Sequence, residues 1–379
     1  MSHDPRGPHG PYGRRDPLPE HCADLTAEWL GRMLARRHPG TVVERLETVE
    51  VRSTHTSKVR VAVEYNAAGR AAGLPGHLCL KGNFTGTPNP FDICRTEARV
   101  YHDLLTDHGL PVPRAYLGDW DADSTRGLVV LEDLVELGGE FGSTYQHLGI
   151  DGVARALDDL AVLQARFWDA PALHAARWLP RSMDTPGDCD QPRTIWWLVE
   201  ENLGRDVYRE RLPAWMVADP QRFLRAYDLL NVWARDRRGP VTLVHGDSYL
   251  GNTYRRPDGT RIWLDWQMAR TGSGLRDMSY FVVGALTIEE RRAAERDLLA
   301  HYRDALRAAG VREVPDQETW WEDYRRWAMY GLMSWMGTRD HWGQDNHTAI
   351  HRFSVATDDL GTLALLEGGP AVRAAGSRG

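Results

Sequence analysis

The stretch Leu243-Val244-His245-Gly246-Asp247-Ser248-Tyr249-Leu250-Gly251-Asn252 joins a short apolar strand to a polar loop. Leu243 and Val244 predict the strand, and the loop that follows presents Asp247 and then Asn252. A carboxylate can orient a hydroxyl and accept its proton, and an amide oxygen can bind a hard cation such as Mg²⁺. The presence of both groups on one loop predicts a reaction centre in this segment.

The spacing of His245, Asp247 and Asn252 is that of the H-x-D-x-x-x-x-N catalytic loop of protein kinases, with Gly246 where that loop carries arginine. In that loop the aspartate receives the proton of the attacking hydroxyl, and the asparagine binds Mg²⁺. A chance match in a chain of this length has odds on the order of one in several hundred. The loop therefore indicates phosphoryl transfer to an alcohol.

The chain from Asn252 to Asp265 predicts a hairpin with Asp258-Gly259 at its tip. If that pair forms a two-residue turn, Asn252 and Asp265 are cross-strand partners with Cβ atoms about 4.5–5.5 Å apart. Two oxygen donors at that separation can share one cation. Because Pro257 can shift the turn, the register is a hypothesis. The alternative is a solvated hairpin in which both residues are incidental.

Lys81 ends a short apolar strand, and Glu97 lies on the apolar face of a helix predicted over about 91–108. A carboxylate in an apolar stripe is costly unless it is paired, and Lys81 is its natural partner. In kinases such a pair holds the lysine against the nucleotide phosphates. The alternative is that both are separate, solvent-facing charges. Their position ahead of the Asp247 loop favours the functional interpretation.

The character of the chain changes after its first third. Alternating apolar residues predict a strand at 59–65, a short apolar run predicts another at 78–81, and a strand pair is expected near 114–120 and 128–132. Helical periodicity dominates after Asp151. This order predicts an α+β fold with two lobes. We expect a disordered tail over 1–21, a β-rich nucleotide-binding lobe over 22–134, a mostly helical lobe with the catalytic loop and acceptor site over 135–367, and a second disordered tail over 368–379.

The composition excludes several classes of protein. The chain has 379 residues with a formal net charge of −7, which does not favour a nucleic-acid partner. No run is long and apolar enough to predict a membrane span, and the polar N-terminus does not resemble a signal peptide. The four cysteines have no metal-ligand spacing, which is typical of a reduced, cytoplasmic protein. We expect a monomer or a homodimer.

These motifs resemble the aminoglycoside phosphotransferase/choline kinase superfamily, and most closely its ecdysteroid-kinase-like (CHK) branch. The resemblance extends from about residue 22 to 366 and is most specific between His245 and Asp265. Looser matches are Leu25–Leu30, Leu131–Leu134 and Arg276–Phe281. It implies a bilobal protein-kinase-like fold that uses ATP and Mg²⁺.

The resemblance also implies a role for each residue of the site. Asp247 is the catalytic base, Asn252 and Asp265 bind Mg²⁺, Lys81 contacts the nucleotide phosphates, and Glu97 positions Lys81.

Further residues support the same site by resemblance. Asp277 supports the catalytic loop from a following helix, and His245 braces that loop. The backbone at the crossover Glu132–Leu134 holds the adenine. Relatives often cover the phosphates with a Ser/Thr-rich loop, and because no glycine lies between Val51 and Val59, Thr54 and Ser57 are the candidates here, beside His55 and Thr56. Gln164 stands where relatives tend to carry histidine, and no function is inferred for it.

The acceptor is expected in the helical lobe near Asp247. Tryptophans offer flat apolar walls with a polar edge, and the chain has 15 of them. Candidates are Trp196, Trp197, Glu200, Glu201, Trp320, Trp321, Trp327, Trp335 and Trp342. Core packing is the alternative for the tryptophans. Glu322, Asp323, Asp340 and Asp345 are candidates for holding an amine, or else part of a solvated face.

The sequence thus predicts an ATP/Mg²⁺-dependent kinase that phosphorylates a hydroxyl of a sugar-, steroid- or antibiotic-like small molecule. Two alternatives stay open. One is a catalytically silent binding protein with the same fold, and the other is an enzyme that nucleotidylates its substrate.

Overall fold

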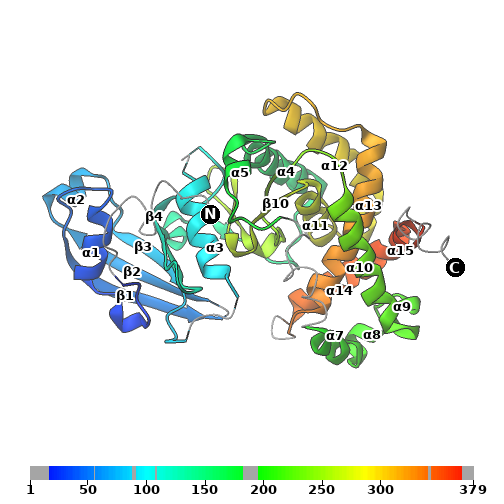
Figure 1. The fold of residues 1–379 in the computed structure, drawn as a ribbon, viewed down its shortest axis with the longest axis horizontal. Helices are drawn as coiled ribbons and strands as arrows, with labels where there is room; N and C mark the ends of the chain where they lie inside the picture. The colour runs from blue at the N-terminus through cyan, green and yellow to red at the C-terminus, as the bar shows by residue number, and fades with distance from the viewer. Residues whose placement is uncertain are drawn as a thin grey trace. The chain divides into compact units, whose positions relative to one another are not determined.

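The computed structural model describes residues 17–54, 56–87, 91–106, 109–181, 195–339 and 343–368. The chain forms two compact units: unit 1 comprises Met1–Gly139 and Leu264–Met268, and unit 2 comprises Glu140–Trp263 and Ala269–Gly379. Unit 1 contains a β-sheet, and unit 2 is mostly helical (Figure 1). The predicted α+β class, β-rich first and helical second, is confirmed. The predicted tails lie mostly outside the described residues.

Unit 1 is built on an antiparallel sheet of five strands in the order β1-β2-β3-β5-β4. In β2 the predicted alternation is present, with Val59, Val61 and Val63 buried and Arg60 and Glu64 more exposed. The strands are β1 (Val43–Ser53), β2 (Ser57–Tyr65), β3 (His77–Gly82), β4 (Ala115–Trp120) and β5 (Gly127–Glu132).

Two helices pack on this sheet. Helix α1 (Ala27–Ala35) begins at the N-cap Thr26 and buries Trp29 and Leu30 in a core that includes Leu80. Helix α3 (Ile93–Arg99) continues into a π-helical turn, η3 (Val100–Leu104), and α2 (Ala67–Ala71) is short. Because neighbouring residues of a strand point to opposite faces, Leu80 enters the core with α1, and Lys81 points to the other face.

Unit 2 is organised around α11 (Leu275–Ala285), every residue of which is buried. Helix α11 packs against α13 and α14, and Figure 1 shows these helices together in the helical part of the chain. The other helices are α4 (Gly149–Arg166), α5 (Pro171–Ala175), α7 (Trp196–Leu203), α8 (Asp206–Arg209), α9 (Ala214–Ala218), α10 (Pro220–Asp236), α12 (Ile288–Ala308), α13 (Gln317–Met336), α14 (Gln344–Asp359) and α15 (Thr362–Glu367). Its strands are β6 (Glu140–Phe141), β7 (Thr242–Val244), β8 (Thr253–Arg255), β9 (Arg261–Trp263) and β10 (Arg270–Gly272).

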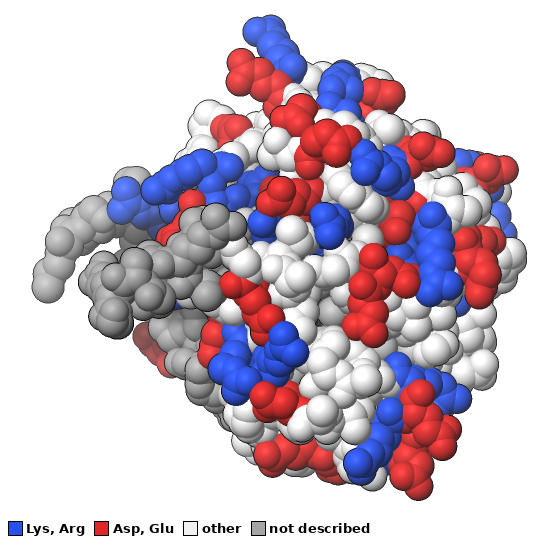
Figure 2. All heavy atoms as spheres, turned by 90° about the vertical axis from the view of Figure 1, so that its right-hand side faces the viewer, with Lys and Arg blue, Asp and Glu red and all other residues white. Residues whose placement is uncertain are grey.

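Acidic and basic side chains lie side by side on the surface. The face shown in Figure 2 carries both signs of charge in close alternation, without a patch of one sign. In unit 2, Arg222 pairs with Glu367 at 2.6 Å and Arg292 pairs with Asp359 at 2.7 Å. Such pairs contribute little to stability individually. None of the described helices combines the length and the apolar character that crossing a membrane requires.

Gly127 allows α3 to lie directly on the sheet. A Cβ atom at Gly127 would stand 2.2 Å from the carbonyl oxygen of Cys94 and 2.7 Å from the Cα of Arg95. We expect Gly127→Ala to lower the stability of unit 1 by about 1–3 kcal/mol, because the backbone of α3 must move to make room. Denaturant unfolding measures this change. Gly76→Ala is the control, since its Cβ would approach nothing nearer than 3.9 Å. Equal stability of the two variants would contradict the close packing of α3.

Candidate active site

The hairpin after the catalytic loop has a different register from the predicted one. Thr253 pairs with Trp263 and Arg255 with Arg261, one residue away from the expected pairing. The chain turns over Pro257–Gly259: Arg256 donates its N–H to Thr260 O at 2.8 Å, and Gly259 has a φ of 94°. The predicted two-residue turn was therefore wrong. Asn252 and Asp265 are not cross-strand partners, because Pro257 lies in a longer loop.

The carboxylate of Asp247 is held at both of its oxygens within unit 2. Asn252 Nδ2 donates to Asp247 Oδ2 at 2.9 Å and to the Asp247 carbonyl oxygen at 2.9 Å. The Tyr280 hydroxyl, on α11, donates to Asp247 Oδ1 at 3.4 Å. Asn252 is the last residue of the 3-10 turn η5 (Leu250–Asn252), and this turn brings its amide back toward the start of the loop. The orientation of Asp247 is thus fixed by two neutral donors.

Tyr280 was not predicted as a site residue. Burial and the neighbouring carboxylate of Asp247 raise the pKa of the Tyr280 phenol well above its ordinary value. The phenol therefore stays protonated and remains a donor to Asp247 at physiological pH. The only sequence signal was its position in the segment Arg276–Phe281, which does not indicate a contact with Asp247.

Asp277 fixes the start of the loop through the backbone. Its Oδ2 accepts the N–H of His245 at 2.7 Å, and its Oδ1 accepts the N–H of Gly246 at 3.0 Å. The His245 ring is buried, and its Nδ1 accepts the N–H of Asp247 at 3.2 Å. The centroid of the His245 ring lies 6.2 Å from that of the Trp263 ring. Asp277 and His245 therefore both contact the loop backbone, as the roles predicted for them require.

Gln164 is a second residue that the sequence did not reveal. Its side chain is fully buried on α4, and Nε2 donates to Asp277 Oδ2 at 3.1 Å. Its Oε1 accepts the hydroxyl of Tyr302. Because Nε2 and Oε1 of an amide are donor and acceptor, Gln164 links Tyr302 to Asp277. A glutamine in a helix pattern carries no sign of such a contact, which depends on how α4 packs near α11.

Lys81 is buried between two carboxylates within unit 1. Its Nζ lies 2.7 Å from Glu97 Oε2 and 2.7 Å from Asp265 Oδ1. Glu97 Oε1 also accepts the N–H of Trp266 at 3.0 Å. The predicted pairing of Lys81 with Glu97 is confirmed. Asp265 joins the pair because the segment Leu264–Met268 belongs to the same compact unit.

Lys58 also approaches this cluster, with its Nζ 3.9 Å from Asp265 Oδ2. Burial alone lowers the pKa of Lys81, but the carboxylates of Asp265 and Glu97 outweigh burial and raise it. Lys81 is therefore a permanent ammonium at physiological pH. Asp265 adopts a left-handed backbone conformation with a φ of 66°, which is uncommon for a residue other than glycine. Such strain often marks functional positions.

The residues predicted to contact the nucleotide all lie in unit 1. Glu132 ends β5, and Leu134 begins the 3-10 turn η4 (Leu134–Leu137). Ser53 and Ser57 pair across the β1–β2 hairpin with their hydroxyls 3.1 Å apart. Ser57 is buried, whereas Thr54 is exposed at the turn, and His55 lies outside the described residues. Thr54 is therefore more accessible to a ligand than Ser57.

Asn252 in unit 2 and Asp265 in unit 1 each carry an oxygen of the kind that binds Mg²⁺. Asn252 uses its amide nitrogen on Asp247, and its Oδ1 accepts no hydrogen bond from the described residues. An amide oxygen and a carboxylate are hard ligands of the kind Mg²⁺ prefers. Within the described ranges, no three His, Cys, Asp or Glu side chains form a metal-binding group. A dedicated protein cage is not needed, because Mg²⁺ keeps several waters and binds substrate phosphates.

Three of the seven tryptophans proposed for the acceptor site belong to the core. Trp320, Trp327 and Trp335 are buried, and Trp335 packs edge-on against Tyr249 with centroids 5.2 Å apart. Trp197 is 52% exposed. Trp342 and Asp340 lie outside the described residues.

The acidic candidates for an amine-binding site already have partners. Asp323 accepts from Arg237 Nε at 2.7 Å, and Asp345 accepts the N–H of Thr144 at 2.7 Å. Neither is an open carboxylate that waits for a ligand.

The comparison with known families supports the motif interpretation. The model of the ecdysteroid kinase-like family matches residues 207–312, which include the loop 245–252, the hairpin that follows it and α11. The predicted resemblance to this branch is therefore confirmed over that part of the chain. A search of the curated proteins found no match.

Solved structures are similar over most of the chain. One is a spectinomycin phosphotransferase in complex with ADP and spectinomycin. The two sequences are 11% identical, the match covers 90% of this chain and 98% of that chain, and the TM-score is 0.47. A second is a putative aminoglycoside phosphotransferase from Ralstonia eutropha. The sequences are 14% identical, the match covers 87% of this chain and 94% of that chain, and the TM-score is 0.48. A third is a choline kinase from Streptococcus pneumoniae. The sequences are 15% identical, the match covers 84% of this chain and 94% of that chain, and the TM-score is 0.46. Likeness of this degree does not indicate what this protein binds.

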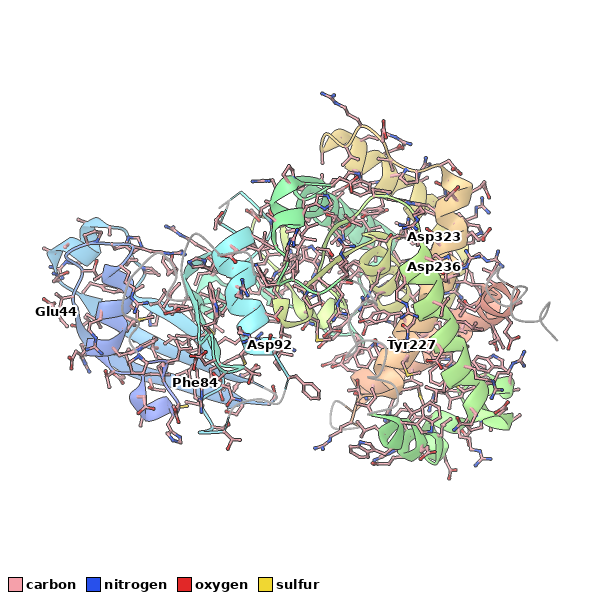
Figure 3. The ribbon with its side chains drawn as sticks, viewed as in Figure 1. Glu44, Phe84, Asp92, Tyr227, Asp236 and Asp323 are labelled. Carbon is pink, nitrogen blue, oxygen red and sulfur yellow. The ribbon has the colours of Figure 1, made fainter. Side chains whose placement is uncertain are left out.

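The contacts of Asp277 predict the effect of replacing it. In Asp277→Asn, an NH₂ group stands where an oxygen accepts, so that donor faces donor at His245 N, Gly246 N or Gln164 Nε2. We expect a loss of about 1–3 kcal/mol in the stability of unit 2, measured by denaturant unfolding. Asp236→Asn is the control, because Asp236 is exposed at the end of α10 (Figure 3). Unchanged stability of Asp277→Asn would contradict the anchoring of the loop by this carboxylate.

Proposed function

We propose that this protein is an ATP- and Mg²⁺-dependent phosphotransferase that moves the γ-phosphate of ATP onto a hydroxyl of a small molecule. The burial of Lys81 between Glu97 and Asp265 carries this proposal. Burying the Lys81 ammonium with the Glu97 carboxylate is costly, so a structural role alone gives little reason for the pair. A lysine held in this way is suited to binding phosphate oxygens. The matched ecdysteroid kinase-like segment supports the same reaction.

The proposed reaction is a direct transfer in one step. Asp247 orients the acceptor hydroxyl and accepts its proton while the acceptor oxygen forms a bond to the γ-phosphorus. The bond from that phosphorus to the bridging oxygen breaks, and ADP leaves with the electron pair. Because Asn252 and Tyr280 hold both oxygens of Asp247, the base is oriented before the acceptor binds.

The remaining roles are proposed residue by residue. Lys81, positioned by Glu97, would bind the phosphates of ATP. Mg²⁺ neutralises phosphate charge when bound, and Asn252 and Asp265 would hold it. The adenine would lie at the backbone of Glu132 and Leu134. Thr54 and Ser57 would lie near the phosphates. His245 and Asp277 would keep the catalytic loop in place.

The acceptor is proposed to be a hydroxylated small molecule of sugar-, steroid- or antibiotic-like character. The exposed Trp197 on α7 is one apolar surface on which such a molecule could pack. We further propose that the protein acts in the cytoplasm as a monomer or a homodimer.

Asp247→Asn tests the catalytic step. We expect kcat to fall by about 10²–10⁴-fold with nucleotide binding retained, because asparagine cannot accept the proton. The assay follows ADP formation with an acceptor identified by screening hydroxylated metabolites, and Asp297→Asn on the exposed face of α12 is the control. Equal rates for Asp247→Asn and wild type would refute a role of Asp247 as base. A product that gains one phosphate supports a kinase, a nucleotidyl adduct indicates nucleotidylation, and a binding protein forms neither.

Asp265→Asn tests the metal site. Loss of a carboxylate ligand should raise the Mg²⁺ concentration for half-maximal activity by about tenfold or more at fixed ATP. The measurement is initial rate against Mg²⁺ concentration, with Asp258→Asn at the exposed hairpin tip as the control. If the Mg²⁺ dependence is unchanged and only the KM for ATP rises, Asp265 serves Lys81 and does not bind the metal.

A further inference from the structure

A cavity in unit 2 lies outside all the residues assigned so far. Its volume is about 510 Å³. Its walls are the end of the α8 segment, the N-terminus of α12 and one face of α14. The lining residues are Arg211, Thr287, Ile288, Glu289, Gln344, His347, Thr348, His351 and Arg352. Cavities of roughly 300–1,000 Å³ are the usual size for sites that bind small organic molecules.

Arg352 contributes a partly buried positive charge to this cavity. Its Nη1 donates to the carbonyl oxygens of Thr144 at 2.7 Å and of Gly284 at 2.5 Å. Within the described part of the chain it forms no ion pair with a carboxylate. Burial lowers the pKa of Arg352, and Glu290 offsets this only in part. A guanidinium removed from water without a counter-charge is costly, and an anion in the cavity would remove that cost.

The other basic groups of the cavity face the same space. Arg211 donates only to the carbonyl oxygen of Val207 and, among the described residues, has no carboxylate partner. His351 Nδ1 is buried with no hydrogen-bond partner among the described residues. Thr287 is the N-cap of the long helix α12, whose N-terminus carries a partial positive charge. Glu289 is the single acidic residue of the lining, and its side chain is exposed.

We propose that this cavity binds a small organic anion whose phosphate or carboxylate group lies between Arg352, Arg211 and His351. The planar guanidinium groups suit the paired oxygens of either group. Ile288 offers an apolar wall for the organic part. The site consists of different residues from the proposed nucleotide and acceptor chemistry, and the inference does not depend on that chemistry.

Binding at this site should take up a proton. Burial, with Arg211 and Arg352 nearby, lowers the pKa of His351, while Glu289 acts in the opposite direction. His351 is therefore neutral near pH 7 in the free protein. A bound anion favours the imidazolium and raises that pKa, so affinity should increase as the pH falls below 7. His347 also lines the cavity, and His147 and Glu290 form a pair nearby at 2.8 Å, so His351→Gln is needed to assign the effect to His351.

Calorimetric titration at constant ionic strength tests the proposal. The probes are phenyl phosphate and benzoate, with benzamide as the neutral comparison. We expect both anions to bind and benzamide not to bind. The anion with the lower Kd shows whether the cavity prefers a phosphate or a carboxylate group. Arg211→Gln and His351→Gln should each raise Kd by about tenfold. His351→Gln should abolish the pH dependence of benzoate binding, which is the pH test because phenyl phosphate itself changes charge at about pH 6. Arg209→Gln, an exposed arginine of α8 outside the cavity, is the matched control.

Other outcomes overturn the proposal. Absence of binding by both anions, or equal binding by Arg211→Gln and wild type, would refute an anion site here. Phenyl phosphate could also bind where ATP is proposed to bind, so the titration is repeated with Lys81→Met. Binding lost in Lys81→Met but kept in Arg211→Gln assigns the probe to the nucleotide site and refutes the cavity. Binding kept in Lys81→Met and weakened in Arg211→Gln supports the cavity, whatever the fate of the proposed kinase activity.

Discussion

The contact between the buried carboxylate of Asp277 and the backbone of His245 and Gly246 holds the start of the Asp247 loop within unit 2. Two loop N–H groups, from His245 and Gly246, donate to this carboxylate, and they would otherwise be buried without acceptors. Gln164 fixes the carboxylate from α4, and α11 carries it within a completely buried helix. Asp247 directly follows this anchored segment, and Asn252 and Tyr280 then orient its side chain.

Unit 1 depends on a comparable constraint, the burial of charge. Lys81 is tolerated away from water because two carboxylates lie within hydrogen-bonding distance of its Nζ. That arrangement requires α3 to lie close to the sheet, which Gly127 allows by having no side chain. The same rule highlights the cavity in unit 2. Arg352 is partly buried there without an ion pair among the described residues, and Glu290 offsets the cost only in part, which is the basis of the anion site proposed above.

The structure departs from the sequence-based prediction in the hairpin register, and it adds contacts of Gln164 and Tyr280 that were not predicted. The hairpin was predicted from Asp258-Gly259, but Pro257 joins the turn and shifts the register by one position. The contacts of Gln164 and Tyr280 with Asp277 and Asp247 join residues far apart in the sequence. Neither a helical period nor a motif predicts such contacts, because they depend on how helices pack.

The sequence by itself determined the division into a β-rich and a helical part, the loop with Asp247 and Asn252, and the pairing of Lys81 with Glu97. These features follow from local spacing and from the cost of a charge in an apolar stripe, both of which can be read along the chain. Only the tertiary structure decided the hairpin register, the residues that hold Asp247 and Asp277, and the basic cavity beside α14. They arise from the burial of distant segments against one another, where small packing differences decide which polar groups meet.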